Sequence, residues 1–129
     1  FLLWLLHCYF VIGTAVNDPE YKCPEYRLAV LKQSHLERLE AEQQRIEQQV
    51  RLPHAFIVSA GNTLAAQVDV TTTTVRTLER SLSRLQEAVP EFDGAVIIPF
   101  VNRLSDYFFM LARLLEGDTH QTVDYSLLA

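Results

Sequence analysis

The chain has 129 residues, a net charge of −5 and 49% hydrophobic residues, which is the size and composition of one globular domain. Its 11 Lys and Arg residues form no cluster and are outnumbered by 16 Asp and Glu residues. This argues against a nucleic-acid surface, which depends on concentrated positive charge. We predict a single domain over residues 1–129 with no direct nucleic-acid partner.

Cysteine and histidine usage indicates neither a disulfide framework nor a metal centre. Cys8 lies in an apolar run, where a free thiol is commonly buried, and Cys23 follows in a predicted loop. The four histidines are scattered without zinc-ligand spacing. We expect reduced thiols, no bound structural metal and a reducing intracellular compartment; the cytoplasm and the mitochondrial matrix both fit.

The first predicted element is an apolar helix over residues 1–16, FLLWLLHCYFVIGTAV. It has no basic segment before it and is shorter than the roughly 20 residues that span a bilayer. We interpret it as a helix buried in a bundle, ended by Asn17-Asp18-Pro19. The alternative is a membrane-associated bundle anchored by FLLWLLHCYF, although no membrane partner is expected.

After a loop over residues 19–27, an amphipathic helix is predicted over residues 29–50. Apolar residues recur there at three- and four-residue steps, at Leu36, Leu39, Ile46 and Val50, with Gln43 completing the series. Glu, Gln and Arg occupy the remaining positions, which indicates a broad solvated face.

Leu52-Pro53-His54 interrupts the helical pattern, and a long helix is predicted from Ser59 or Asn62 as N-cap to about Val89. Its seam residues have the spacing of a helix bundle: Leu64, Val68, Thr71, Val75, Leu78, Leu82, Leu85 and Val89. Four consecutive threonines, Thr71 to Thr74, cost about 0.5 kcal/mol each relative to alanine. We expect their hydroxyls to bond back to carbonyls one turn earlier.

The last predicted helix covers residues 99–115, with Pro99 in its first turn and Gly117-Asp118 after its end. It repeats the apolar spacing at Val101, Leu104, Phe108, Leu111 and Leu115. The tail to Ala129 is expected to be irregular. The predicted fold class is therefore all-α, an up-and-down bundle with four helices.

Two predicted helices also carry polar groups at helical spacing. Arg76, Glu79 and Arg80 share one face of the long helix, and Asp106 lies one turn from both Asn102 and Arg103 on the last helix. Guanidinium groups can bind triphosphate by forked hydrogen bonds, and a carboxylate can hold magnesium. The alternative interpretation is an ion-pair network that ties the two helices together.

Two stretches carry most of the specific sequence information: FIVSAGNTLAAQVDVTTTTVRTLER, residues 56–80, and FVNRLSDYFFMLARLL, residues 100–115. Both resemble segments of the PduO-type ATP:cob(I)alamin (corrinoid) adenosyltransferases. The match continues upstream to LPHAFI, residues 52–57, and weaker matches precede it at FVIGTA, residues 10–15, and LERLE, residues 36–40, so the resemblance covers nearly the whole chain. The NRLSDY segment is the most specific piece.

The resemblance implies a five-helix bundle that forms trimers, with ATP and a corrinoid bound between subunits. In the family reaction, a Co(I) nucleophile attacks the 5′ carbon of ATP and expels triphosphate. Phe56 resembles the phenylalanine at the lower face of the corrin; Arg76, Glu79, Arg80 and Asn102 match positions that contact the nucleotide. ATP, magnesium and a corrinoid are the implied ligands, with none bound as the alternative.

Several positions depart from the family pattern. Thr72 stands where the family has an arginine that supports an interface ion pair, and Thr77 replaces a second arginine. Val58-Ser59-Ala60-Gly61 replaces L-P-G-G, and Val68-Asp69 replaces L-H. The T-x-x-G-D-x-G-x-T loop that cradles phosphates in the family is not found in this sequence.

Two functional hypotheses follow. The first is an adenosyltransferase-like subunit that is catalytically impaired and serves a structural or interaction role, in a homo- or hetero-trimer or a larger assembly. The second is an active adenosyltransferase whose ATP loop lies in a segment outside this sequence, since the chain begins at Phe1 and not at methionine.

Overall fold

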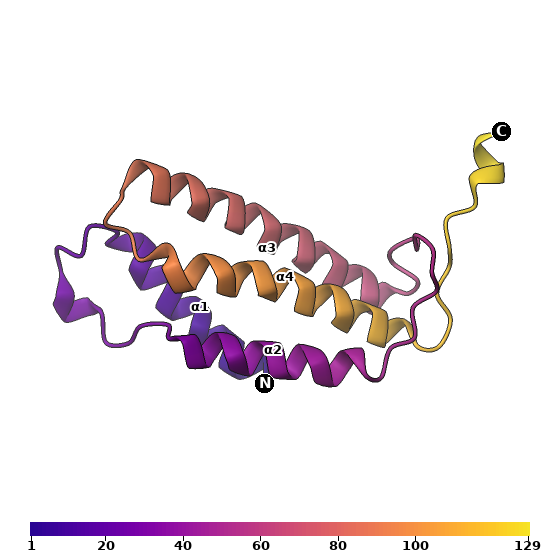
Figure 1. Ribbon diagram of the computed structural model, residues 1–129, viewed down its shortest axis with the longest axis horizontal. Helices are drawn as coiled ribbons and strands as arrows, with labels where there is room; N and C mark the ends of the chain where they lie inside the picture. Colours follow the sequence, from indigo (N-terminus) through magenta and orange to yellow (C-terminus); the bar gives the residue numbers. More distant parts are fainter.

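The computed structural model describes residues 1–129 and is helical throughout its core. The four main helices are α1 (Leu2–Asn17), α2 (Gln33–Glu47), α3 (Thr63–Ala88) and α4 (Gly94–Glu116). Short 3₁₀ turns lie at Pro24–Tyr26 and Tyr125–Leu128. Figure 1 shows α4 between α3 and α2, with α1 crossing behind them. The predicted all-α bundle is confirmed.

The core forms around α4, whose apolar face is the most extensively buried in the molecule. Its buried side chains include Phe100, Val101 and Leu104, and Leu39, Ile46, Val75 and Leu82 meet them from α2 and α3. By length and composition α4 could also cross a membrane. The central helix of a bundle is commonly as long and as apolar as a membrane span, and α4 is the central helix here.

The predicted start of α4 at Pro99 was wrong, because the helix begins five residues earlier at Gly94. Upstream residues Phe92 and Ile97 are buried in the core, which favours the extra turn. Pro99 is exposed but lies inside the helix, past its first turn, where it removes one backbone hydrogen bond and crowds the preceding turn. A Cβ at Gly94 would meet Gln86 Oε1 at 2.1 Å, so a larger residue would displace the Gln86 side chain that accepts a hydrogen bond from the Gly94 N–H.

Other boundaries were closer to prediction. Asn62 is the N-cap of α3, and its side chain accepts a hydrogen bond of 2.8 Å from the Ala65 N–H. Leu64, expected in the seam, is 54% exposed, and Ala65 is buried in its place. Helix α2 is shorter than predicted, since it begins at Gln33, after an extended Lys32 whose N–H donates to His35.

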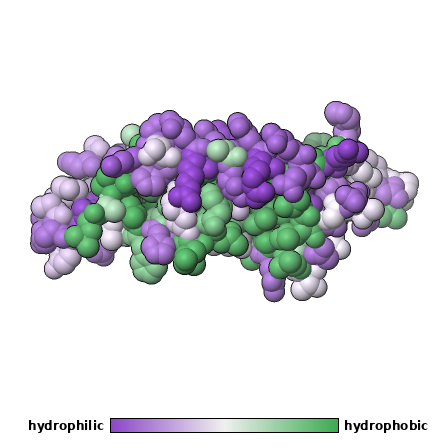
Figure 2. Space-filling view, turned by 90° about the horizontal axis from the view of Figure 1, so that it is seen from below, coloured by the Kyte–Doolittle hydropathy of each residue, from purple (hydrophilic) through white to green (hydrophobic).

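Helix α1 was predicted to be a helix buried in the bundle, and the structure shows that only one of its faces is buried. Leu5, Cys8 and Ile12 are buried, but no element of the chain covers the opposite face. Leu3, Leu6 and Phe10 are exposed there, Phe10 to 80%. Figure 2 shows a hydrophobic band along the molecule beside a hydrophilic one.

Aromatic contacts attach α1 to the bundle. The Trp4 ring stacks on His35 of α2 at 6.3 Å and meets the edge of Phe100 of α4 at 6.2 Å. The Arg38 guanidinium lies 4.4 Å from the centre of the same indole. Arg38 therefore serves the α1–α2 contact, whereas Glu42 pairs with Arg45.

The threonine run behaves as the sequence predicts. Thr71 and Thr72 donate to the carbonyls of Gln67 and Val68, and Thr73 and Thr74 both donate to Val70. Thr73 and Thr74 are exposed, so no packing offsets their low helix propensity. We predict that replacing both by alanine raises the free energy of unfolding by about 1 kcal/mol, measured by urea denaturation. A lower free energy of unfolding would contradict this prediction. Thr72→Ala is the comparison variant, because Thr72 is partly buried whereas Thr73 and Thr74 are exposed.

Tyr107 makes the stability of the fold depend on pH in the alkaline range. Its ring is 3% exposed, and burial, together with the nearby Glu42 charge, raises the pKa of its phenol to about 12. The unfolded phenol ionises at about 10, so the contribution of Tyr107 to stability is complete below that pH. We predict that this contribution is lost as the pH rises from about 10 to about 12. Urea unfolding across this range checks it; Tyr107→Phe should reduce the slope and leave the part due to the Tyr9 phenol, whose pKa is also raised to about 12, and an unchanged slope would contradict the assignment.

Candidate nucleotide and corrinoid site

A polar hollow of about 290 Å³ lies between α3 and α4, near the middle of both helices. No hydrophobic residue lines it. Its lining residues are Arg76, Glu79, Arg80, Ser83, Asn102, Ser105 and Asp106. The same hollow is therefore lined by all four predicted nucleotide contacts: Arg76, Glu79, Arg80 and Asn102.

Helical spacing places these side chains together. On α3 the polar residues follow three- and four-residue steps, while Val75 and Leu82 on the other face enter the core. On α4 the same division separates Asn102 and Asp106 from the buried Leu104. The apolar contacts of the two helices thus hold two polar edges side by side.

One hydrogen bond closes the base of the hollow. The Asn102 amide Nδ2 donates to Glu79 Oε1 over 2.9 Å and so links α4 to α3. Ser83 and Ser105 use their hydroxyls on carbonyls of their own helices, those of Glu79 and Asn102. Asn102 keeps its second amide hydrogen and its side-chain oxygen available for a ligand.

The two arginines that line the hollow from α3, Arg76 and Arg80, have no carboxylate partner. Arg80 Nη2 donates only to the Thr77 hydroxyl, at 3.0 Å, and Arg76 forms no ion pair. Arg103 is different, since it lies 3.2 Å from both Glu40 and Asp106. The ion-pair network considered as an alternative is therefore not formed by Arg76 and Arg80, and both guanidinium groups can receive an anion.

Phe56 lies apart from the hollow, in the segment before α3. Its ring is 79% exposed, and its carbonyl accepts a hydrogen bond of 2.8 Å from the Val123 N–H. Ile57 and Thr122 form an isolated antiparallel bridge at the same place, where the segments meet at one end of the molecule (Figure 1). The predicted corrinoid contact and the predicted nucleotide contacts do not meet within one chain.

Comparison with known proteins decides the family. The family model described as cobalamin adenosyltransferase matches residues 1–115. The chain belongs to the cobalamin adenosyltransferase family. Corrinoid adenosyltransferases of Mycobacterium bovis and Mycobacterium tuberculosis are 31% identical to it over 111 residues, 84% of this chain and 56% of theirs. The corrinoid adenosyltransferase of Mycobacterium leprae is 32% identical over 100 residues, 78% of this chain and 50% of its own.

The chain thus spans about half the length of the curated relatives it matches. The matched region includes every residue that we assigned to the hollow, and also Phe56. Family membership therefore covers the helices from which the hollow and the Phe56 segment are built.

Three positions that the sequence comparison predicted to depart from the family pattern form contacts within this chain. The Thr72 hydroxyl donates to Val68 O at 3.1 Å, so this position supplies no cation to a neighbouring chain. Thr77 lies beside the hollow and accepts from Arg80. Asp69, which was predicted to replace a family histidine, accepts from the buried Arg113 at 2.7 Å.

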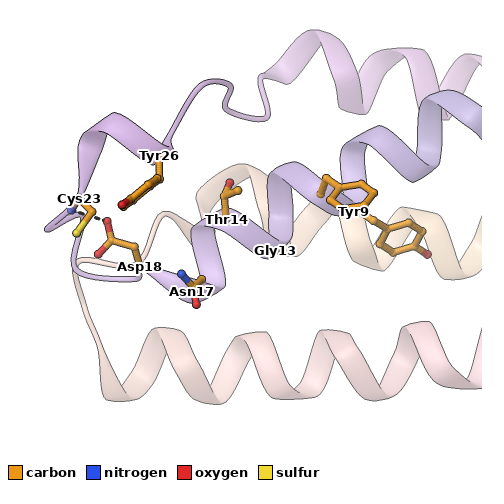
Figure 3. Close-up of a pocket in the computed structure, with 8 residues that line it drawn as sticks. Tyr9, Gly13, Thr14, Asn17, Asp18, Cys23 and Tyr26 are labelled. Atoms are coloured by element: carbon orange, nitrogen blue, oxygen red, sulfur yellow. Dashed lines mark hydrogen bonds between the residues drawn. The ribbon is translucent and has the colours of Figure 1, made fainter.

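A second hollow, of about 500 Å³, was missed by the sequence analysis. It lies where α1 meets the Pro24–Tyr26 turn, with Tyr9, Gly13 and Thr14 from α1 and Cys23 and Tyr26 opposite (Figure 3). Gly13 leaves its floor open, because a Cβ there would meet nothing within 4 Å. The glycine within the predicted helix was the only sequence indication of this hollow.

The chemistry of this second hollow does not suit a triphosphate. Asp18 is its ionised group, and the backbone N–H groups of Cys23 and Lys22 hold the pKa of its carboxyl below the usual range. Burial raises the pKa of the Tyr9 phenol to about 12, so it stays neutral. The second hollow is lined by a carboxylate and by no cation, which disfavours phosphate, whereas in the α3–α4 hollow two guanidinium groups lie beside the carboxylates of Glu79 and Asp106.

Proposed function

We propose that this chain supplies the nucleotide- and corrinoid-contacting helices of an ATP:corrinoid adenosyltransferase, with the triphosphate of ATP bound in the α3–α4 hollow. One observation carries the proposal: Arg76 and Arg80 are unpaired guanidinium groups beside Asn102 in an entirely polar hollow. Forked hydrogen bonds from arginine to phosphate are among the stronger polar contacts in proteins.

The chemistry of adenosyl transfer gives these groups a role. The cobalt–carbon bond forms at C5′ of ATP as the C5′–O bond breaks, and the electron pair of that bond leaves with triphosphate. Negative charge therefore grows on the leaving group, and Arg76 and Arg80 would stabilise it. Glu79 and Asp106 are the carboxylates that would hold Mg²⁺ beside the phosphates, since Mg²⁺ is usually bound by one or two carboxylates and substrate oxygens.

The separation of Phe56 from the hollow supports an oligomer. A corrinoid bound against Phe56 could reach ATP in the hollow of a neighbouring chain, as in the trimers that the family resemblance implies. The exposed apolar face of α1, including Leu3, Leu6 and Phe10, supports burial against another subunit of the same or a related kind. Two free thiols and the need for Co(I) support a reducing intracellular compartment.

A second candidate is a catalytically impaired subunit with a structural or interaction role. Thr72 favours it, because a hydroxyl bonded within its own helix cannot replace an interface arginine. Under this proposal the chain keeps the bundle and binds one or neither ligand.

Titration with MgATP and with hydroxocobalamin, followed by an assay for adenosylcobalamin under reducing conditions, separates the two candidates. Binding of both and formation of adenosylcobalamin support the transferase, and Asn102→Ala should then abolish turnover. Binding without turnover supports the impaired subunit; if Thr72 is the cause, Thr72→Arg should restore adenosylcobalamin formation. Absence of MgATP binding would refute the assignment of the hollow.

A further inference from the structure

A buried charged cluster lies where α3 begins and α4 ends. At its centre is Arg113, which is 0% exposed and whose Nη2 lies 2.7 Å from Asp69 Oδ2 and 2.9 Å from Glu116 Oε1. Its guanidinium also lies 5.0 Å from the centre of the Phe109 ring. One cation thus holds a carboxylate of α3 and a carboxylate of α4 together.

Both carboxylates also hold the loop that precedes α3. Asp69 Oδ2 accepts from the Ala60 N–H at 2.9 Å, and Glu116 Oε1 accepts from the Gly61 N–H at 3.1 Å. Ala60 has a φ of 67°, a conformation that is costly for a residue with a Cβ. The cluster therefore fixes a loop that would otherwise relax.

His120 extends the cluster to the C-terminal segment. Its Nδ1 lies 2.8 Å from Glu116 Oε2, and its side chain is 3% exposed. The next residues pair with the segment that contains Phe56: Val58 N donates to Gln121 O at 2.7 Å, and Val123 N donates to Phe56 O at 2.8 Å. We call residues 56–58 and 121–123 the strap.

The strap is held from both sides. Ala60 and Gly61 fix its first segment through the two carboxylates, and His120 fixes its second segment through Glu116. The Phe56 ring contributes little to its own position, because it is 79% exposed. Where the ring lies therefore depends on backbone pairing, and the pairing depends on the cluster.

We propose that His120 is a positioning residue: through Glu116 it holds the strap and sets Phe56 where a corrinoid would contact it. The part of this proposal that concerns the corrinoid rests on the proposed function, whereas the part that concerns the position of the strap does not. No part of it requires His120 to touch either substrate.

Hydrogen exchange tests the strap without any ligand. In His120→Ala, the amides of Val58 and Val123 should exchange at least about tenfold faster than in the wild-type chain, while the Leu104 amide in the core is unchanged. His120→Gln, which keeps an N–H donor, should restore part of the protection. His54→Ala is the matched control, since His54 is exposed and forms no hydrogen bond. Unchanged exchange at Val58 and Val123, or equally faster exchange at Leu104, would overturn the proposal.

Ligand binding tests the consequence for Phe56. His120→Ala should weaken hydroxocobalamin binding on the order of tenfold and leave MgATP binding within about twofold, and it should add nothing in a Phe56→Ala background. An additive loss in that background would show that His120 does not act through Phe56. If the wild-type chain binds no hydroxocobalamin, the proposed function fails for the corrinoid, and the exchange measurement alone decides whether His120 holds the strap.

Discussion

Replacing Arg113 by alanine is expected to lower the free energy of unfolding by about 3–5 kcal/mol. The arginine is fully buried, and its removal leaves the Asp69 and Glu116 carboxylates close together without a cation. Both carboxylates are themselves largely buried, at 16% and 2% exposure, so water cannot solvate them fully. Urea denaturation, monitored by helical circular dichroism, measures the loss.

Two further variants separate the charge effect from a general effect of losing arginine. Arg84→Ala removes an exposed arginine of α3 that forms no ion pair, and its cost should stay within about 0.5 kcal/mol. The triple variant Arg113→Met, Asp69→Asn, Glu116→Gln removes all three charges and keeps acceptors for Ala60 and Gly61. It should recover at least about half of the loss, because a neutral site avoids uncompensated buried charge. A cost below about 1 kcal/mol for Arg113→Ala would show that the cluster is not as buried as described.

The sequence alone could not indicate that Arg113, Asp69, Glu116 and His120 form one buried cluster. Arg113 and Glu116 are three residues apart on a helix, which is the spacing of an ordinary surface pair. Asp69, which joins this pair into a buried cluster, is 44 residues away in the sequence, where it was noted only as a departure from the family pattern. His120 fell in a tail that was expected to be irregular. Burial of a charge is a property of the packed fold, and no local pattern encodes it.

The bundle and the hollow were more predictable, because both follow from helical periodicity. The three-four spacing of α3 fixed which face enters the core, and so it also fixed that Arg76, Glu79 and Arg80 share the other face. Asn62 was a correct N-cap for a local reason, its side-chain oxygen. The prediction from Pro99 was wrong for a tertiary reason, since burial of Ile97 in the core outweighs the local cost of a proline inside the helix. Spacing could not show whether Arg76 and Arg80 were paired, since this depends on side-chain positions across two helices.

Replacing both Arg76 and Arg80 by alanine is expected to weaken the binding of MgATP and of inorganic tripolyphosphate by at least about 100-fold. A hydrogen bond to a charged group contributes about 1.5–3 kcal/mol, so the loss of two guanidinium groups corresponds to about 3–6 kcal/mol. Isothermal titration with each ligand measures the change. Tripolyphosphate isolates the contribution of the phosphates from that of the nucleoside.

Two controls separate the loss of phosphate binding from a general effect of removing arginine. Arg84 lies one turn beyond Arg80 on α3 and does not line the hollow, so Arg84→Ala should leave both affinities within about twofold. Because Arg76 and Arg80 are exposed and have no carboxylate partner, their loss should change the free energy of unfolding by less than about 0.5 kcal/mol. Unchanged tripolyphosphate affinity in the double variant would refute the hollow as the triphosphate site.

Lysine at the same two positions distinguishes geometry from charge. Arg76→Lys with Arg80→Lys keeps both positive charges but replaces planar forks by single ammonium groups. If phosphate is held by forked hydrogen bonds, this variant should lose at least about tenfold in tripolyphosphate affinity; if only the net charge attracts the anion, it should bind like the wild-type chain. Raising the salt concentration should weaken binding to the lysine variant more steeply in relative terms, because the remaining attraction is long-range and screened.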